Sequence, residues 1–275
     1  MNDLNAFVTR SPRELRMAFR DGSLDLTTSG LAPDYVQANL VALPAEFAFD
    51  FLLFCQRNPR PCPLVEVLEA GDTEPKSALG ADLRTDLPRY RVWRNGELVE
   101  EATDARTAWR DDMVSFLIGC SFSFEAALLA ANIPVRHIEC SCNVPMYRTT
   151  LRCIPAGRFS GPLVVSMRPI PGPLVAAAVQ ISAQMPHAHG APVHVGDAAA
   201  LGIRDLGDPD YGDPVPIGDG DVPVFWACGV TPQAVVVASR VPLAITHSPG
   251  RMFITDRRND YYTSRGLQSD LPAPH

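Results

Sequence analysis

The sequence predicts an α/β protein in which a larger α/β layered domain, residues 1–143 and 205–275, carries an inserted smaller α+β domain, residues 144–204. Strand and helix patterns alternate along the first part, and a strand–strand–helix–strand (ββαβ) run follows it. A passage rich in Gly, Pro and Asp at residues 207–221 then acts as a connector. With 275 residues, 46% of them hydrophobic, the chain can bury one large core or two smaller ones.

The N-terminal region shows helix signals first. Ser11, Pro12 and Glu14 form a capping-box pattern with proline at the first helical position. Residues 32–54 have helical apolar spacing, with a break expected near Pro44. The remaining elements predicted before residue 143 are a strand at 64–68, a hairpin at 90–94 and 97–100 around Asn95-Gly96, and helices at 111–117 and 123–131.

The inserted domain is predicted from strands at 147–153 and 163–168, a helix at 173–183 and a strand at 192–195. Beyond the connector, the larger domain is expected to resume with a buried strand at 222–227, a helix at 232–239, and strands at 243–246 and 252–255. We expect the junction between the two domains to line the main pocket.

Charge and composition exclude several function classes. The chain has 31 Asp plus Glu against 24 Lys plus Arg, so it has no basic surplus for nucleic acid. Lys76 is the only lysine and lies in a polar loop sequence, which disfavours Schiff-base chemistry with pyridoxal phosphate. No phosphate-binding G-x-x-x-x-G-K-[ST] loop is present. We expect no cofactor, and the sequence leaves assistance by a divalent metal open.

Seven cysteines, an odd number in a long chain, argue against a secreted disulfide framework and favour reduced thiols in a cytoplasmic protein. The N-terminus lacks the pattern of a signal peptide. Residues 40–54 are apolar, but proline and carboxylate residues interrupt them, so we expect no membrane span. The expected partner is a small carboxylate substrate, and the sequence leaves a homo-oligomer open.

Two polar motifs are candidate substrate contacts. The segment GCSFSFE at 119–125 places Ser121 and Ser123 ahead of a helix, where free N–H groups favour an anion; simple helix capping is the alternative. The segment NVPMYRT at 143–149 offers polar groups at the edge of the insert. Its candidates are Asn143, Tyr147, Arg148 and Thr149, and with Arg168 they complete the predicted carboxylate-binding set, although an arginine on a strand is more often only solvated.

Histidines and a strand-to-helix turn supply further candidates. His187, His189 and His194 lie within a short segment, but no fourth ligand completes a metal site, so we expect none that is structural. In FWACGVTPQ, residues 225–233, Cys228 and Gly229 end a strand, and Thr231 and Gln233 begin a helix. His247 lies in the polar turn THSPG, residues 246–250, where it is a natural general base or a histidine that only ties the turn together.

These segments together resemble a bacterial hydro-lyase family related to D-glutamate cyclase. The resemblance extends over nearly the whole chain. It is carried by the segments at 119–125, 143–149, 161–168, 189–194, 222–233 and 245–250. The resemblance implies a lyase of glutamate metabolism that removes water from D-glutamate to give 5-oxo-D-proline.

Cyclisation requires a base for the substrate ammonium, an anchor for a carboxylate, and an acid for the leaving oxygen. We assign the base to His247 or, second, to His194, and the acid to Glu125 or Asp256, provided that burial raises its pKa. Cys228 is a lower-ranked covalent nucleophile. Two alternatives stay open: a hydro-lyase that acts on another small hydroxy or amino acid, and a non-catalytic binding module for small carboxylates.

Overall fold

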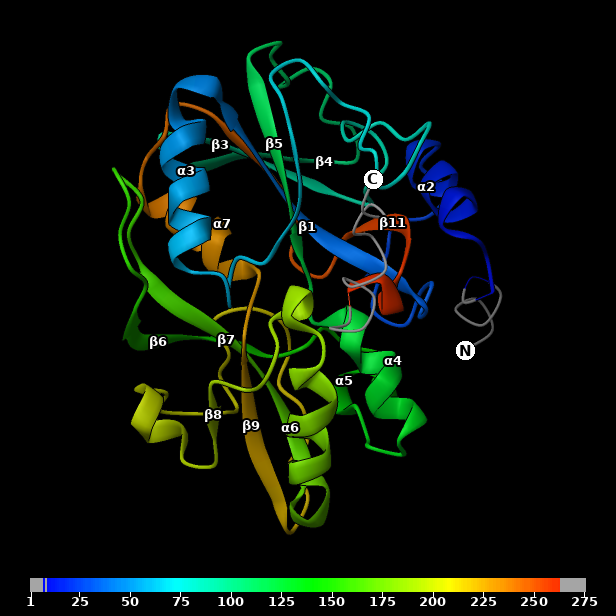
Figure 1. The fold of residues 1–275 in the computed structure, drawn as a ribbon, viewed down its shortest axis with the longest axis vertical. Helices are drawn as coiled ribbons and strands as arrows, with labels where there is room; N and C mark the ends of the chain where they lie inside the picture. Colours follow the sequence, from blue (N-terminus) through cyan, green and yellow to red (C-terminus); the bar gives the residue numbers. More distant parts are fainter. Residues whose placement is uncertain (1–6, 8, 263–275) are drawn as a thin grey trace, which may run out of the picture.

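The computed structural model describes residue 7 and residues 9–262, and it contains two antiparallel sheets with helices packed against them (Figure 1). The predicted α/β class, in the sense of mixed helices and sheets, is confirmed. No helix among the described residues is long and apolar enough to cross a membrane.

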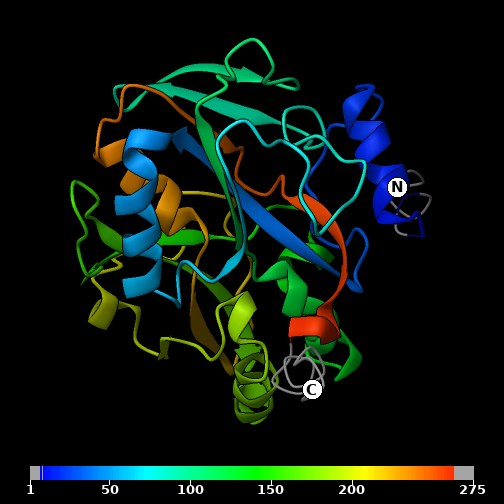
Figure 2. The same ribbon diagram turned by 45° about the horizontal axis from the view of Figure 1, so that its top comes forward.

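The larger sheet, sheet A, is built around the long buried strand β1. Its strand order is β2-β5-β1-β10-β3-β4, and β11 pairs with the first part of β1. The bounds are β1 Tyr35–Pro44, β2 Leu64–Leu68, β3 Tyr90–Arg94, β4 Glu97–Ala102, β5 Met113–Gly119, β10 Ala244–His247 and β11 Phe253–Arg258. Figure 2 shows β1 in blue through the centre of the molecule.

The smaller sheet, sheet B, crosses the predicted domain boundary. It comprises β6 Met146–Arg152, β7 Pro162–Pro171, β8 His194–Val195 and β9 Asp221–Ala227, in the order β6-β7-β9-β8. The expectation that residues 222–227 belong to the larger domain is wrong, because β9 pairs with β7 along its whole length, from Val165↔Ala227 to Pro171↔Asp221. An apolar strand does not reveal in its sequence which sheet it completes. The rest of the proposed division stays a prediction.

Helices cover both sheets. Their bounds are α2 Pro12–Arg20, α3 Ala45–Arg57, α4 Phe122–Ala130, α5 Arg136–Glu139, α6 Val175–Ala183 and α7 Val230–Ala238, with short 3-10 turns at Gly172–Leu174, Pro186–Ala188, Ala198–Leu201 and Asn259–Tyr262. Helices α3 and α7 cover one face of sheet A, where Phe51 and Val235 pack with Phe116. Helices α4 and α6 share a cluster with sheet B around Trp226.

Most predicted elements are confirmed, and two are wrong. The capping box at Ser11 is present with both of its hydrogen bonds, and residues 90–102 form the predicted hairpin. Helices were expected within residues 32–54 and at 111–117, but residues 35–44 and 113–119 are the paired strands β1 and β5 instead. Both strands are buried on two faces, so they lack the apolar–polar alternation that identifies a half-exposed strand in a sequence.

Candidate functional site

Strand ends from both sheets converge on residues 38–40 of β1. Gly119 at the end of β5 pairs with Ala38, and His247 at the end of β10 lies beside Leu40. Gly229, just after β9, packs on the amide of Asn39 so closely that a Cβ there would collide with it. Polar residues follow each of these strand ends, so the fold brings together segments that are far apart in the sequence.

A buried ion-pair network lies at the start of α4. The Arg168 guanidinium donates to Glu125 Oε1 from Nε (3.1 Å) and Nη2 (2.5 Å). It also donates to the hydroxyls of Ser121 (2.9 Å) and Ser166 (3.1 Å). On the other side of the carboxylate, His137 Nε2 lies 3.1 Å from Glu125 Oε1. Sequence analysis predicts Ser121, Glu125 and Arg168 as separate candidates, and the structure joins them.

The network keeps Glu125 ionised. Burial by itself raises the pKa of this carboxyl group, but the neighbouring His137 and Arg168 outweigh burial and lower the pKa to about 2. The raised pKa that a general acid requires is therefore absent, and this part of the prediction is wrong. Arg168 also stacks over Phe124 and Trp226, with its Cζ 5.0 and 5.4 Å from the two ring centroids. These contacts fix the guanidinium inside the protein.

His247 is fully buried and neutral. The backbone N–H of Leu40 donates to His247 Nδ1 (3.2 Å), so the imidazole occupies the next position of the ladder between β10 and β1. Burial and, to a lesser extent, the positive charge of Arg91 lower the pKa of His247 to about 4. His247 Nε2 has no hydrogen-bond partner in the described part of the chain. A buried ring nitrogen without a partner is a polar group that the surrounding protein leaves unsatisfied, and such a group requires an explanation.

A polar cleft of about 660 Å³ is lined by Ser248, the residue that follows this histidine, and we call it the Arg91 cleft. His247 itself is buried and is not one of its lining residues. Arg91 and Glu101 from the β3–β4 hairpin form one part of its wall, and Arg251 forms another. The cleft is lined by Thr27, Arg91, Glu101, Ser141, Cys142, Asn143, Asp210, Tyr211, Gly212, Asp213, Ser248, Pro249 and Arg251. Its two strand residues, Arg91 and Glu101, both belong to sheet A, and its other lining residues lie outside the named strands and helices. The expectation that the junction between the two domains lines the main pocket stays a prediction.

Hydrogen bonds hold the walls of the Arg91 cleft in place. Arg91 Nε donates to Glu101 Oε1 (3.4 Å), and Ser248 Oγ donates to the same oxygen (2.7 Å). Arg251 Nε donates to Asp25 Oδ1 (3.0 Å). The predicted residue Asn143 packs on Gly250, where a Cβ would lie 2.7 Å from Asn143 Nδ2. Its Oδ1 has no partner among the described residues.

Three predicted residues on β6 have other roles in this structure. The Tyr147 hydroxyl donates to Leu206 O (2.7 Å), and the Thr149 hydroxyl donates to Leu163 O (2.8 Å). Arg148 is 56% exposed and lies against Tyr211, whose hydroxyl accepts from its Nη2 (2.6 Å). Arg148 therefore lacks the enclosed surroundings that make a guanidinium a strong anchor.

The predicted residues at the start of α7 stabilise the fold. Thr231 Oγ1 accepts from Val164 N (2.9 Å) and ties α7 to sheet B. Gln233 Nε2 donates to Thr246 Oγ1 (2.6 Å) and His247 O (2.7 Å), so it holds the strand end that carries the histidine. Cys228 is buried, and burial raises the pKa of its thiol to about 11, which keeps it protonated. A protonated thiol is a poor nucleophile.

We expect Gly229→Ala to destabilise the protein by about 1–3 kcal/mol, because the added Cβ must displace the Asn39 amide. That amide donates to Ile118 O (3.0 Å) and Gly119 O (2.9 Å) at the end of β5. Gly172→Ala is the matched control, since its Cβ would meet Gly220 O at 3.4 Å and Val222 Cγ2 at 3.9 Å, which are ordinary contacts. Urea unfolding compares the two variants, and equal stability would contradict the tight packing at Gly229.

Two further candidates lie apart from the convergence of strand ends. Asp256 lies on β11, and its side chain is 44% exposed. Its carboxylate accepts from Arg16 Nη1 (2.9 Å). His194 lies on β8, with Nε2 2.8 Å from Asp197 O. The structure therefore does not bring Asp256 or His194 together with His247.

The histidine-rich segment is dispersed in the fold. His189 Nδ1 donates to Arg60 O (2.8 Å), far from the contact that His194 makes within its own turn. Among the described residues, no group of three or more His, Cys, Asp and Glu side chains is placed to hold a metal ion.

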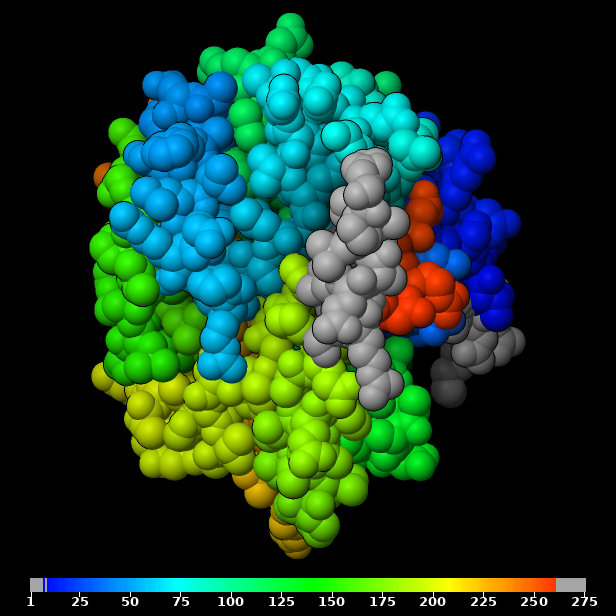
Figure 3. Space-filling view, viewed as in Figure 1, coloured from blue at the N-terminus to red at the C-terminus, as the bar shows by residue number. Residues whose placement is uncertain are grey.

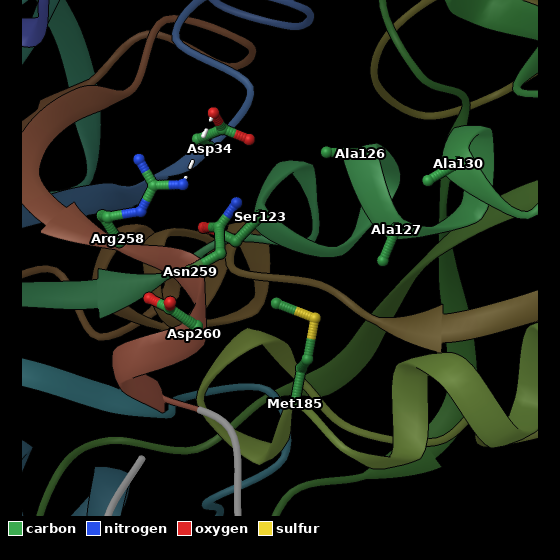
Figure 4. Close-up of a pocket in the computed structure, with 9 residues that line it drawn as sticks. All are labelled: Asp34, Ser123, Ala126, Ala127, Ala130, Met185, Arg258, Asn259 and Asp260. Atoms are coloured by element: carbon green, nitrogen blue, oxygen red, sulfur yellow. Dashed lines mark ion pairs between the residues drawn. The ribbon is translucent and has the colours of Figure 1, made fainter. Parts of the chain in front are cut away.

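Ser123 faces a different pocket (Figure 4). The pocket measures about 320 Å³, and α4 supplies one wall through Ala126, Ala127 and Ala130. An ion pair of 3.6 Å between Arg258 and Asp34 lies on the opposite side. The Ser123 hydroxyl accepts from Gln37 N (3.1 Å), so its polar atom ties α4 to β1.

The buried groups predict that folding stability falls in acid. Glu125 has a lowered pKa, so its contribution is present above pH 4.5 and is lost as the pH falls towards 2. His189 and His247 each have a pKa lowered from 6.5 to about 4, so the unfolded chain takes up their protons first as the pH falls below 6.5. We expect each histidine to lower the free energy of unfolding by about 2 kcal/mol between pH 7 and pH 5.

Urea unfolding at pH 7 and pH 5 measures this loss of unfolding free energy. His247→Gln removes one of the two histidines, so the loss should be smaller by about 2 kcal/mol. A His247→Gln variant with the parental difference between the two pH values would contradict the assignment.

Sequence analysis did not identify several residues of this region. Arg91 and Glu101 look like ordinary exposed residues of a hairpin, and only the pairing of β3 with β10 brings them to the cleft. His137 follows α4 without any motif. Asn39 had one available signal, since an amide within an apolar stretch requires a partner when it is buried.

Comparisons with known proteins place these segments in a family. The sequence profile described as D-glutamate cyclase matches residues 114–256. A protein of Stutzerimonas stutzeri named "Putative hydro-lyase" is 60% identical over 94% of this chain and 98% of its own. A protein of Streptomyces avermitilis with the same name is 60% identical over 92% of both chains.

A third relative, from Geobacillus kaustophilus, has the same description and is 58% identical over 91% of this chain and 95% of its own. Among solved structures, the chain aligns with a nitrogen repressor-like protein from Methanococcus jannaschii, with a TM-score of 0.37 and 8% identity over 85% of this chain and 91% of that one.

Proposed function

Since the chain belongs to the D-glutamate cyclase family, we propose that it cyclises D-glutamate to 5-oxo-D-proline in the Arg91 cleft. The names of its relatives support lyase chemistry with loss of water. In this reaction the amine nitrogen bonds to the γ-carboxyl carbon, and one carboxyl oxygen leaves. The two protons that the ammonium gives up leave with that oxygen as water.

One observation carries the proposal: the family's matched segments supply the polar cleft beside a buried histidine with an unpaired ring nitrogen. Asn143, Ser248 and Pro249 of those segments line the cleft, and His247 precedes Ser248. His247 is buried and does not itself line the cleft, but it lies between Ser248, which does, and Thr246, whose backbone pairs with Arg91. A buried, neutral imidazole next to a polar cleft suits proton transfer.

The two arginines of the cleft are the proposed carboxylate anchors. Arg168 is held by Glu125 and two serine hydroxyls, and Arg148 is largely exposed, so neither suits this role in the structure. Arg91 and Arg251 line the cleft, and each is oriented by one carboxylate. Glutamate has two carboxylates, and two guanidinium groups that line the same cleft match that charge pattern.

The remaining groups suit the ammonium and the proton transfer. Glu101 and the unpaired Asn143 Oδ1 are acceptors on the cleft wall and suit the substrate's ammonium. A His247 pKa of about 4 makes the free imidazole a weak base. A substrate carboxylate bound by Arg91 would raise that pKa, because an opposite charge favours imidazolium. Substrate binding would therefore strengthen the base.

Arg91→Gln should raise KM and lower kcat/KM by about tenfold to a hundredfold, because a charged two-point contact is lost. Arg106→Gln is the matched control, since Arg106 is a 62% exposed arginine paired with Asp104. The assay incubates each purified protein with D-glutamate, L-glutamate and a panel of hydroxy acids, and detects 5-oxoproline and unsaturated products by mass spectrometry. Parental kcat/KM in Arg91→Gln would place the anchor elsewhere.

Product from a hydroxy acid alone would favour a different hydro-lyase. Saturable D-glutamate binding without any product would favour a binding module.

A further inference from the structure

A second cavity, separate from the Arg91 cleft, lies between the end of α3 and sheet B, and we call it the Arg152 pocket. It measures about 480 Å³ and has no lining residue in common with the Arg91 cleft. The segment after α3 forms one side, and β6, β7 and residue 193 form the other. In Figure 3 the light-blue end of the α3 region reaches down to the yellow-green residues near 190.

The charges that line the Arg152 pocket are all positive. Arg57, Arg60 and Arg152 are its charged residues, although the chain as a whole has net charge −7. Within the described residues, none of these three arginines forms an ion pair with a carboxylate; Arg57 and Arg60 donate to backbone carbonyls instead. Three guanidinium groups without an acidic partner give the pocket a positive potential that favours an anion.

The rest of the lining is mainly apolar. Pro59, Pro61, Leu163 and Val193 face the same space as the arginines. Pockets with apolar walls and a few placed charges are typical of small organic ligands. A fully hydrated inorganic ion would leave this apolar surface uncovered, and a neutral hydrocarbon would leave the guanidinium charges unpaired.

Buried polar side chains hold the pocket walls in position. Asn58 Nδ2 donates to Ile154 O (2.8 Å), and Ile154 N donates back to Asn58 Oδ1 (2.8 Å), which joins the two sides. Arg60 is held at both ends, because its carbonyl accepts from the buried His189 and its guanidinium donates to Pro192 O (3.0 Å) and Ala191 O. The fold thus fixes the two walls and Arg60 in advance, which lowers the entropic cost of binding, while Arg57 and Arg152 are exposed at the edge of the pocket.

We propose that the Arg152 pocket binds an organic anion, a carboxylate or a phosphate ester, with a small apolar body. The guanidinium groups pair with the anionic oxygens, and the apolar body covers the proline and aliphatic walls. D-Glutamate fits this site poorly, since it has an ammonium group and no apolar body. The inference does not depend on the cyclase proposal.

Isothermal titration calorimetry of the full chain tests the site with four probes: hexanoate, phenyl phosphate, hexanamide and inorganic phosphate. We expect one-to-one binding of hexanoate or phenyl phosphate, and the stronger of the two identifies the anionic group. Hexanamide and inorganic phosphate should each bind at least about tenfold more weakly, because each lacks one half of the recognised chemistry.

Arg152→Gln should weaken binding of the stronger anion by at least about tenfold. Arg106→Gln should leave that binding unchanged, because Arg106 pairs with Asp104 and does not line the pocket. Circular dichroism checks folding, and Arg57→Gln replaces Arg152→Gln if that variant fails to fold. The proposal is overturned if neither anion binds saturably, if hexanamide or inorganic phosphate binds as tightly, or if the folded arginine variant keeps the parental Kd.

Discussion

His247→Gln is expected to lose at least about a hundredfold in kcat on D-glutamate, since glutamine keeps a hydrogen-bonding side chain but cannot take up a proton. The Leu40 N–H that donates to His247 Nδ1 can donate to the glutamine oxygen instead, so the melting temperature should change by only a few degrees. Steady-state kinetics and thermal unfolding of the same preparation measure both quantities.

His194→Gln is the matched control. The His194 side chain contacts Asp197 O of its own turn and the Phe225 ring, apart from His247, so this variant should keep activity and most of the stability. If His247 only stabilises the turn, His247→Gln should show the reverse pattern: a lowered melting temperature, with activity retained in the folded fraction. A folded and nearly fully active His247→Gln protein would remove His247 from the mechanism.

Arg168→Met is expected to destabilise the protein by about 3–5 kcal/mol, because it leaves the Glu125 carboxylate buried without its cationic partner. Both side chains are nearly inaccessible, with 1% and 3% of their surfaces exposed, so water cannot replace the lost contact. Arg168→Lys should be intermediate, since lysine restores the charge but not the fork that reaches Glu125, Ser121 and Ser166 together.

A double variant tests the cause of this loss. Glu125→Gln combined with Arg168→Met removes both charges and should be more stable than Arg168→Met alone. Arg148→Met is the control, because Arg148 is 56% exposed and its loss should cost less than about 0.5 kcal/mol. If Arg168→Met unfolds in urea like Arg148→Met, the network does not stabilise the fold.

The sequence predicts those elements whose signals are local. The capping box at Ser11 and the Asn95-Gly96 hairpin are confirmed, since their stabilising contacts lie within a few residues. Strands β1 and β5 were predicted as helices because their neighbours come from distant segments, as in the pairing of Val41 with Phe116 and Thr246. Burial on both faces removed the alternation that would have identified them.

In the candidate site, too, local signals were predictable and long-range contacts were not. The motif residues were identifiable one by one, and Ser121, Glu125 and Arg168 form one network in the structure. Their partnership required the topology, because the pKa of Glu125 depends on His137 and Arg168, which both follow it in the sequence, on other elements. The role of Arg91 in the cleft likewise depends on the pairing of β3 with β10.

The most direct measurement is the reaction of D-glutamate with the purified chain in D₂O, with chiral separation and mass spectrometry of the product. The account predicts 5-oxo-D-proline that retains its Cα hydrogen, because cyclisation breaks a C–O bond and forms a C–N bond without touching Cα. Arg91→Gln and His247→Gln should slow its formation. An unsaturated product, deuterium at Cα, or no 5-oxo-D-proline from the parental protein would contradict the account.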